Sequence, residues 1–208
     1  MITYTLHLIR HGMTESNISG AYVGSKTDAP LIKEGIAALK DMRRDFNYPK
    51  ADLVFSSPLL RCVESAKILY PNKDIITIDD IKEFDFGDFE GKTPAELEGR
   101  PDFIAFTSGK ASVPNGESSE ALVKRLCLGL NKMVRIMMQK EKTQAAVLMH
   151  GGTIMMLLAA CGLPQRHTAE WQCSFGEGYT IRVTPSLYQR TGAVEVIDIV
   201  PKESELND

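Results

Sequence analysis

Short apolar runs alternate along this chain with longer segments of helical spacing. The run from Thr5 to Ile9 is β-rich and mostly apolar, as is typical of a buried parallel strand. After a polar loop, apolar residues between Leu31 and Phe46 recur at roughly helical spacing, which predicts an amphipathic helix. The same alternation continues beyond this helix. We predict further strands over residues 52–57, 74–78, 145–149, 179–184 and 193–200, and further helices over residues 58–69, 119–139 and 153–161.

Residues with strong positional preferences define several helix ends. Ser57 followed by Pro58 is a favourable pair for the N-cap and the first helical position. Ser118 or Ser119 is placed to cap the long helix that ends near residue 139. Gly162 is expected to end the helix that begins at residue 153.

One segment shows no clear periodicity of hydrophobic residues. Residues 84–116 are rich in Phe, Gly and Pro, and we predict an irregular excursion that forms a lid over a site. Elsewhere strands alternate with helices, which predicts an α/β fold with a mostly parallel sheet. The length of 208 residues suits a single domain, residues 1–208, that includes this excursion.

Composition excludes several classes of protein. The net charge of −3 provides no general basic field for nucleic acid or an anionic membrane. The longest apolar run is far shorter than the roughly 20 residues of a membrane span. No signal peptide is recognisable before the first strand, so we expect a soluble, cytoplasmic protein. The four cysteines form no C-x-x-C pair, which favours buried, reduced thiols over a zinc site. The oligomeric state is not predicted.

Polar residues follow three of the predicted strands. Arg10-His11-Gly12 comes after the first strand, Ser56-Ser57-Pro58 leads to Arg61 after the second, and His150-Gly151-Gly152 follows a later one. In open α/β sheets ligands bind at the carboxyl ends of the strands. Two arginines and two histidines would converge there if these strands are parallel neighbours. Such a cluster suits a dianion, because guanidinium presents a fixed fork of donors to phosphate oxygens.

Four segments in this order resemble the histidine phosphatase superfamily, also called the phosphoglycerate mutase-like family. They are LIRHGMTESN, SSPLLRCVESA, EFDFGDFEG and MHGG, and the resemblance extends from about residue 4 to residue 184. The segment PNGES is similar to one found in small bacterial members such as the α-ribazole phosphatases. The resemblance implies a three-layer α/β/α sandwich and a phosphatase that needs no cofactor or metal. Its substrate would be a small phosphorylated metabolite.

The resemblance also implies roles for individual residues. His11 would be the nucleophile that forms phosphohistidine, and Glu83 would be the general acid and later the general base. The phosphate oxygens would be bound by Arg10, Asn17, Arg61, His150 and the backbone N–H of Gly151. A neutral imidazole is available near pH 7 because the unperturbed pKa of histidine is about 6.5.

Several alternatives stay open at this stage. Asp85, Asp88 or Glu90 could replace Glu83 as the acid, and Asn17 could simply form an Asx turn. His7 and His167 are expected to be structural. The protein could instead be a phosphoglycerate mutase, or a catalytically silent module that binds phosphorylated ligands.

Two departures from the family pattern matter. Ile32 occupies a position where a threonine hydroxyl would cap a helix, which affects stability rather than chemistry. Phe89 replaces a frequent tryptophan, which leaves the shape of the lid and the natural substrate undetermined.

Overall fold

A mixed seven-stranded sheet forms the centre of the protein. The computed structural model describes residues 2–203, so residue 1 and residues 204–208 of the predicted domain lie outside it. The strand order is β4-β3-β5-β1-β7-β8-β6. The strands are β1 (Tyr4–Arg10), β3 (Leu53–Ser56), β4 (Ile75–Thr77), β5 (Gln144–Met149), β6 (Gly162–Leu163), β7 (Gly178–Val183) and β8 (Val194–Val200). β7 pairs antiparallel with both of its neighbours, and the other pairs are parallel, which confirms a mostly parallel sheet.

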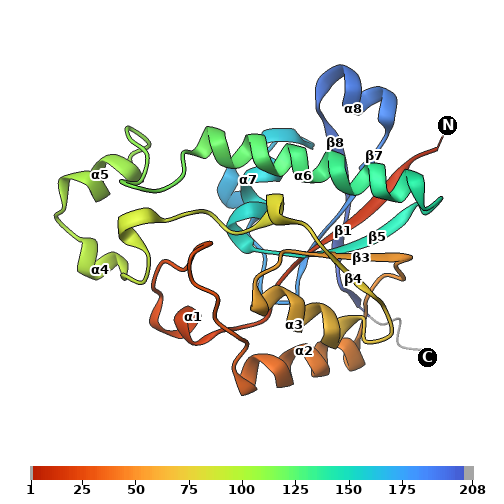
Figure 1. Ribbon diagram of the computed structural model, residues 1–208, viewed down its shortest axis with the longest axis horizontal. Helices are drawn as coiled ribbons and strands as arrows, with labels where there is room; N and C mark the ends of the chain where they lie inside the picture. The colour runs from red at the N-terminus through yellow and green to blue at the C-terminus, as the bar shows by residue number, and fades with distance from the viewer. Residues whose placement is uncertain (1, 204–208) are drawn as a thin grey trace.

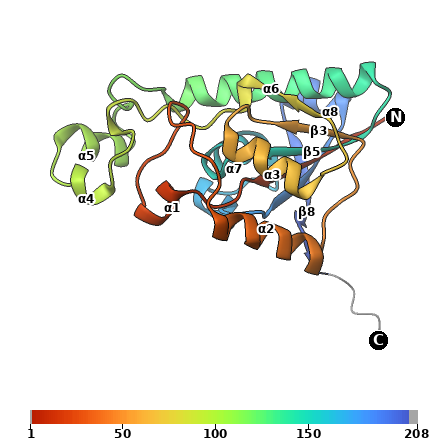
Figure 2. The same cartoon turned by 60° about the horizontal axis from the view of Figure 1, so that its bottom comes forward.

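Helices pack on both faces of the sheet. The helices are α1 (Glu15–Ser19), α2 (Lys33–Asp45), α3 (Leu60–Leu69), α4 (Pro94–Leu97), α5 (Pro101–Thr107), α6 (Ser119–Gln139), α7 (Gly151–Cys161) and α8 (Pro185–Thr191). Figures 1 and 2 show α2 and α3 on one side of β3 and β5 and α6 on the other. This is the predicted three-layer arrangement. A separate two-stranded ribbon joins β2 (Phe46–Asn47) to β9 (Lys202–Glu203).

The alternation of side chains along β5 explains the two layers. Val147 and Met149 pack with α6 and α7, whereas Ala146 and Leu148 pack with α2 and α3. All four are fully buried, because successive side chains of a strand point to opposite faces and both faces are covered. Over residues 2–203, no helix is both long and apolar enough to cross a membrane.

Three predicted helix starts are wrong. α2 begins at Lys33 rather than Leu31, because Ile32 is its N-cap, and it ends at Asp45, because Phe46 belongs to β2. α3 begins at Leu60, so Ser57 and Pro58 lie before the helix and are not its N-cap and first residue. The backbone N–H of Leu60 instead donates to the Asp28 carboxylate over 2.6 Å. α7 begins at Gly151, two residues before the predicted start. The cap of α6 is confirmed as Ser118, whose side chain accepts a hydrogen bond from the Ala121 N–H.

The segment 84–116 lies beyond the carboxyl ends of the parallel strands, at the left of Figure 1. It is less irregular than predicted, because it contains α4, α5 and a 3-10 turn at residues 87–89. Phenylalanines hold it together. Phe89 packs against Phe103 and Phe106, with ring centroids 5.6 and 5.7 Å apart. Phe89 is fully buried in this cluster, in the place for which the family pattern suggests tryptophan.

All four cysteines are free thiols, as predicted. Cys62, Cys161 and Cys173 are buried, whereas Cys127 is only half-buried. Burial raises the pKa of Cys173 to about 11, so this thiol is neutral at physiological pH.

A substitution at the start of α2 should stabilise the protein. Ile32 is the N-cap of this helix and provides no side-chain hydrogen bond. Ile32→Thr adds a hydroxyl that can accept from an unpaired N–H of the first turn. We expect the free energy of unfolding to rise by about 1 kcal/mol relative to Ile32→Val, which has the same shape without the hydroxyl. Denaturant unfolding of the two variants measures the difference, and equal stabilities would contradict the capping argument.

Candidate active site

The register of the sheet brings three polar junctions together. β1 and β3 both pair parallel with β5, with Arg10 opposite Met149 and Ser56 opposite Leu148. The next residue of each strand therefore lies at the same edge. These residues are His11, Ser57 and His150, and each is buried. The imidazole centroids of His11 and His150 are 5.2 Å apart.

The imidazole of His11 is held in one tautomer. Its Nδ1 lies 2.6 Å from the carbonyl oxygen of Gly12. Because a carbonyl can only accept, Nδ1 carries the hydrogen and the neutral ring keeps its lone pair on Nε2. Burial, together with the nearby charge of Arg61, lowers the pKa of His11 to about 3. The imidazole is therefore neutral at physiological pH and available as a nucleophile.

Arg10 has an unused donor beside His11. One of its terminal nitrogens donates to the carbonyl of Cys173 over 2.8 Å, and its guanidinium stacks 4.0 Å from the centroid of Phe175. Its Nε is buried and has no acceptor among the described residues. A side chain at Gly151 would lie 3.0 Å from this Nε. Since buried donors are almost always paired, this one is suited to an incoming anion.

Arg61 is anchored by the backbone of a loop. It is 1% exposed, and its terminal nitrogens donate to the carbonyls of Gly24 and Thr27 over 3.0 and 2.8 Å. Its Nε lies 3.2 Å from Nδ1 of His150. This set of bonds fixes the plane of the guanidinium before any ligand arrives, which lowers the entropic cost of binding an anion.

His150 is neutral and bonds on both sides. Its Nδ1 accepts from Arg61, so its Nε2 carries the hydrogen and donates to Ser57 Oγ over 2.9 Å. Burial and the neighbouring cations lower the pKa of His150 well below its usual value. Ser57 was predicted as a helix cap within one of the three polar junctions, without a role in the site, and the structure places its hydroxyl in the site. Its position at a strand end, like that of His11 and His150, was the available signal.

Glu83 lies at the amino-terminal end of α7. It is 8% exposed, and its Oε1 accepts from the Phe84 N–H over 2.9 Å. A side chain at Gly152 would lie 2.8 Å from Oε1. Burial raises the pKa of Glu83, and the hydrogen bonds from Phe84 and Gly152 and the charge of Arg61 oppose this shift only in part. A raised pKa increases the fraction of protonated carboxyl near neutral pH.

The other nearby carboxylates have structural partners. Glu90 accepts from the N–H groups of Gly24 and Thr27 over 2.9 and 3.0 Å, so it orders the loop that anchors Arg61. Asp85 forms an ion pair with Lys26 at 3.0 Å. Asp88 accepts from the Asn115 side chain.

Arg125 holds the segment that carries Glu83. From α6 its guanidinium donates to the carbonyls of Asp80, Lys82 and Glu83 over distances of 2.7 to 2.9 Å. It also forms an ion pair with Glu117 at 2.7 Å. Sequence reasoning missed this residue. Its only local signal is its place beside Leu122 and Leu126 on the buried face of a helix.

Asn17 and Gly151 complete the predicted set. The side-chain oxygen of Asn17 accepts from the N–H and the hydroxyl of Thr14, both at 2.9 Å. Its side-chain nitrogen, which can only donate, has no partner within residues 2–203. Gly151 is the first residue of α7, so its N–H is one of the helix donors without an intrahelical acceptor.

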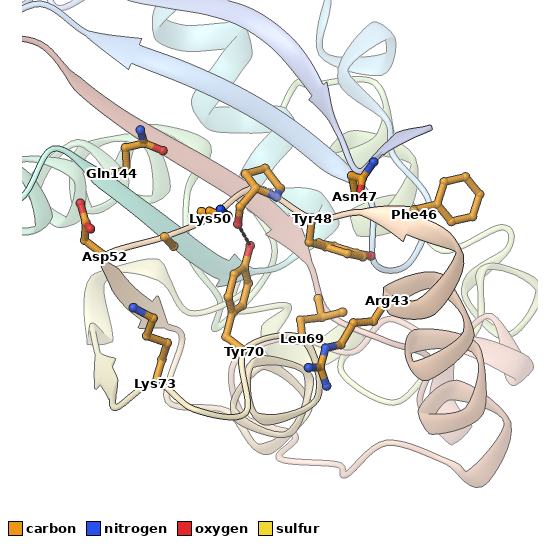
Figure 3. Close-up of a pocket in the computed structure, with 12 residues that line it drawn as sticks. Arg43, Phe46, Asn47, Tyr48, Lys50, Asp52, Leu69, Tyr70, Lys73 and Gln144 are labelled. Atoms are coloured by element: carbon orange, nitrogen blue, oxygen red, sulfur yellow. Dashed lines mark hydrogen bonds between the residues drawn. The ribbon is translucent and has the colours of Figure 1, made fainter. Parts of the chain in front are cut away.

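A cavity of considerable size lies away from these residues. It has a volume of about 600 Å³ and opens at the amino-terminal ends of β3 and β5, where Asp52 and Gln144 line it. Figure 3 shows Arg43, Lys50 and Lys73 around it. None of the predicted site residues lines this cavity, so its size does not identify the reaction site. Among the described residues, no three His, Cys, Asp or Glu side chains gather in a way that could hold a metal ion.

The buried histidines should make stability depend on pH. Burial lowers the pKa of His7 to about 4 and of His11 to about 3, and it lowers the pKa of His150 too. In the unfolded chain each imidazole binds a proton near pH 6.5. The unfolded state therefore holds more protons below that pH, and the free energy of unfolding falls as pH decreases, by up to about 1.4 kcal/mol per unit for each histidine. The raised pKa of Glu83 acts in the opposite direction and offsets part of this loss.

Urea unfolding between about pH 7.5 and pH 5 measures this slope. His7→Gln is expected to reduce it, because this variant removes one of the three groups. His167→Gln, at an exposed position, serves as the control. A stability that does not change over this range would contradict the argument.

Comparisons with known proteins show which proteins this chain resembles. A family model described as the histidine phosphatase superfamily (branch 1) matches residues 6–189. The uncharacterized phosphatase PhoE of Bacillus subtilis is 34% identical over 157 residues, which cover 73% of this chain and 74% of the relative. The adenosylcobalamin/alpha-ribazole phosphatase of Salmonella typhimurium is 27% identical over 160 residues, covering 74% and 77% of the two chains.

Solved structures show the same fold. The alpha-ribazole phosphatase of Shigella flexneri superposes with a TM-score of 0.76 at 20% identity and covers 98% of this chain and 100% of its own. A mutant phosphoserine phosphatase of Entamoeba histolytica in complex with phosphoserine gives a TM-score of 0.72 at 25% identity, with 94% and 96% of the two chains covered.

Proposed function

Because this chain belongs to the histidine phosphatase superfamily and is a phosphatase, we propose that it hydrolyses small phosphate monoesters through a phosphohistidine on His11. The relatives include phosphatases named for alpha-ribazole and phosphoserine, which are both small metabolites. The observation that carries the proposal is the fixed tautomer of His11. The imidazole that carries the Nε2 lone pair is buried, and the charges of two guanidinium groups, those of Arg61 and Arg10, act on it.

In the first step, Nε2 of His11 attacks phosphorus and the bond from phosphorus to the ester oxygen breaks. Glu83 gives its proton to the departing oxygen, which leaves as an alcohol. The raised pKa of Glu83 supports this role, since an acid must be protonated near the operating pH. The Gly12 carbonyl stabilises the positive imidazole ring that forms, because it accepts from Nδ1–H.

In the second step, Glu83 is ionised and takes a proton from water. The hydroxide oxygen attacks phosphorus, the bond to Nε2 breaks, and inorganic phosphate is released. Both carboxyl and imidazole return to their starting forms. Splitting one displacement into two steps of lower barrier is the usual advantage of covalent catalysis.

The phosphoryl oxygens are assigned to donors that the fold leaves available or can share. These are the unpaired Nε of Arg10, the side-chain nitrogen of Asn17, the N–H of Gly151, and the cluster of Arg61, His150 and Ser57. Two guanidinium groups and a helix N-terminus offset the charge of a phosphate dianion. This charge balance supports a reaction that proceeds without a metal ion.

Hydrolysis of p-nitrophenyl phosphate in the presence of EDTA tests the proposal, with rapid acid-free quenching to isolate the phosphoenzyme. We expect turnover that does not depend on metal, and a phosphoryl group that is labile in acid. Tight phosphate binding without turnover would indicate a silent binding module. Isomerisation of 3-phosphoglycerate without net phosphate release would indicate a mutase, and either result would overturn the proposal.

A further inference from the structure

An apolar cavity opens directly beside the candidate acid. Its volume is about 160 Å³, and it is bounded on one side by Glu83 and Gly152. Five apolar side chains from three parts of the chain form the rest of its lining. They are Phe84, Phe86, Phe106, Leu122 and Met156.

Ring contacts fix the aromatic part of this lining. The ring centroid of Phe84 lies 5.0 Å from that of Phe86 and 6.3 Å from that of Phe106. Tyr22 supports Phe86 from behind at 4.9 Å, and Phe89 supports Phe106 at 5.7 Å. Because each wall rests on a second ring, the cavity has a defined shape before a ligand arrives.

Apart from the Glu83 carboxyl and the Gly152 backbone, the lining offers no polar partner. Among the described residues no cationic side chain lines this cavity. Arg125, on the same helix as Leu122, is occupied by three carbonyls and by Glu117. A carboxylate or hydroxyl placed against the apolar part of this lining would lose its water without gaining a hydrogen bond, which is unfavourable.

We propose that this cavity binds the organic part of the substrate, and that it selects monoesters whose alcohol carries an apolar ring or branched alkyl group close to the ester oxygen. The inference rests on the proposed function, because it places the ester oxygen next to Glu83. The volume suits one six-membered ring, since a cavity of roughly 150 Å³ lined by Leu, Ile and Phe side chains can hold benzene. Esters of glycerate, serine and sugars present polar groups that this lining does not bind.

Steady-state kinetics with three esters tests the inference. Benzyl phosphate carries a ring on the first carbon, whereas glycerol 3-phosphate and O-phosphoserine carry polar groups. All three release an unactivated alcohol, so differences report binding rather than the ease of bond cleavage. We expect kcat/KM for benzyl phosphate to be about 10- to 100-fold higher. Equal values, or a preference for the polar esters, would overturn the inference and leave the proposed function intact.

Two variants test whether the selectivity arises in this cavity. Phe106→Leu removes part of the lining and should lower kcat/KM for benzyl phosphate about tenfold, with little change for glycerol 3-phosphate. Phe103→Leu is the matched control, because Phe103 lies on the same helix and in the same aromatic cluster but does not line the cavity. The same loss in both variants would overturn the assignment of the cavity. If no ester is hydrolysed and no phosphoenzyme forms, it is the proposed function that fails.

Discussion

His11→Gln is expected to reduce kcat for every phosphate ester by about 10⁴-fold or more, because the amide cannot form the covalent intermediate. No phosphoenzyme should be isolated from the variant after rapid quenching, whereas the unmodified protein should accumulate it. Phosphate binding should survive, since the guanidinium groups of Arg10 and Arg61 are held by carbonyls and not by His11. Equilibrium binding of inorganic phosphate therefore separates loss of chemistry from loss of the site.

His167→Gln is the control for this experiment. His167 is exposed, lies at the start of a 3-10 turn and is not among the residues assigned to the reaction, so kcat should not change. Near-normal turnover with a trapped phosphoenzyme in His11→Gln would show that another residue is the nucleophile.

Glu83→Gln should produce a loss that depends on the leaving group. Alkyl esters need a proton on the departing oxygen, and removal of a positioned acid costs about 10²- to 10⁴-fold in kcat. p-Nitrophenyl phosphate releases a stable anion, so its first step should be much less affected. Single-turnover measurements of phosphoenzyme formation with both esters isolate this step from the later attack of water.

The pH dependence gives a second readout of the same residue. Burial raises the pKa of Glu83, and the protonated form is lost as pH rises through that value. The rate of phosphoenzyme formation from an alkyl ester should therefore fall on the alkaline side, and Glu83→Gln should lack this decrease. Asp88→Asn is the matched control, because Asp88 is an exposed carboxylate bonded to Asn115. Equal losses with both esters would assign Glu83 a positioning role.

The polar residues at this edge of the sheet could be predicted because the signal for each of them lies in a short stretch of sequence. Arg10-His11-Gly12 and His150-Gly151-Gly152 each combine an apolar strand with an abrupt polar end, and parallel pairing then places these ends side by side. The family resemblance added the roles and the order of the motifs. The helix that follows β5 was also predicted, although it begins two residues earlier than its apolar spacing indicates.

The supporting contacts could not be predicted, because they join residues far apart in the chain. Arg125 binds the carbonyls of Asp80, Lys82 and Glu83, and nothing near Arg125 in the sequence specifies those partners. Ser57 was predicted as a helix cap, but α3 begins at Leu60 and the Ser57 hydroxyl bonds to His150 from another strand end. Propensity rules describe the tendency of serine to cap helices, but they take no account of a partner such as His150 that follows another strand.

In our proposal, the residue that transfers the proton and the residues that bind the organic group are held by different parts of the structure. Its backbone is fixed from α6 by Arg125, while Phe86 and Phe106, which meet the organic group in our proposal, belong to the segment that follows. Substitutions at these two positions could therefore change the lining of the cavity and leave Glu83, the proposed proton donor, in place. A library of variants at these two positions could be screened for hydrolysis of new esters while the chemical step stays the same. The protein is therefore a suitable starting point for engineering a phosphatase for a chosen alcohol.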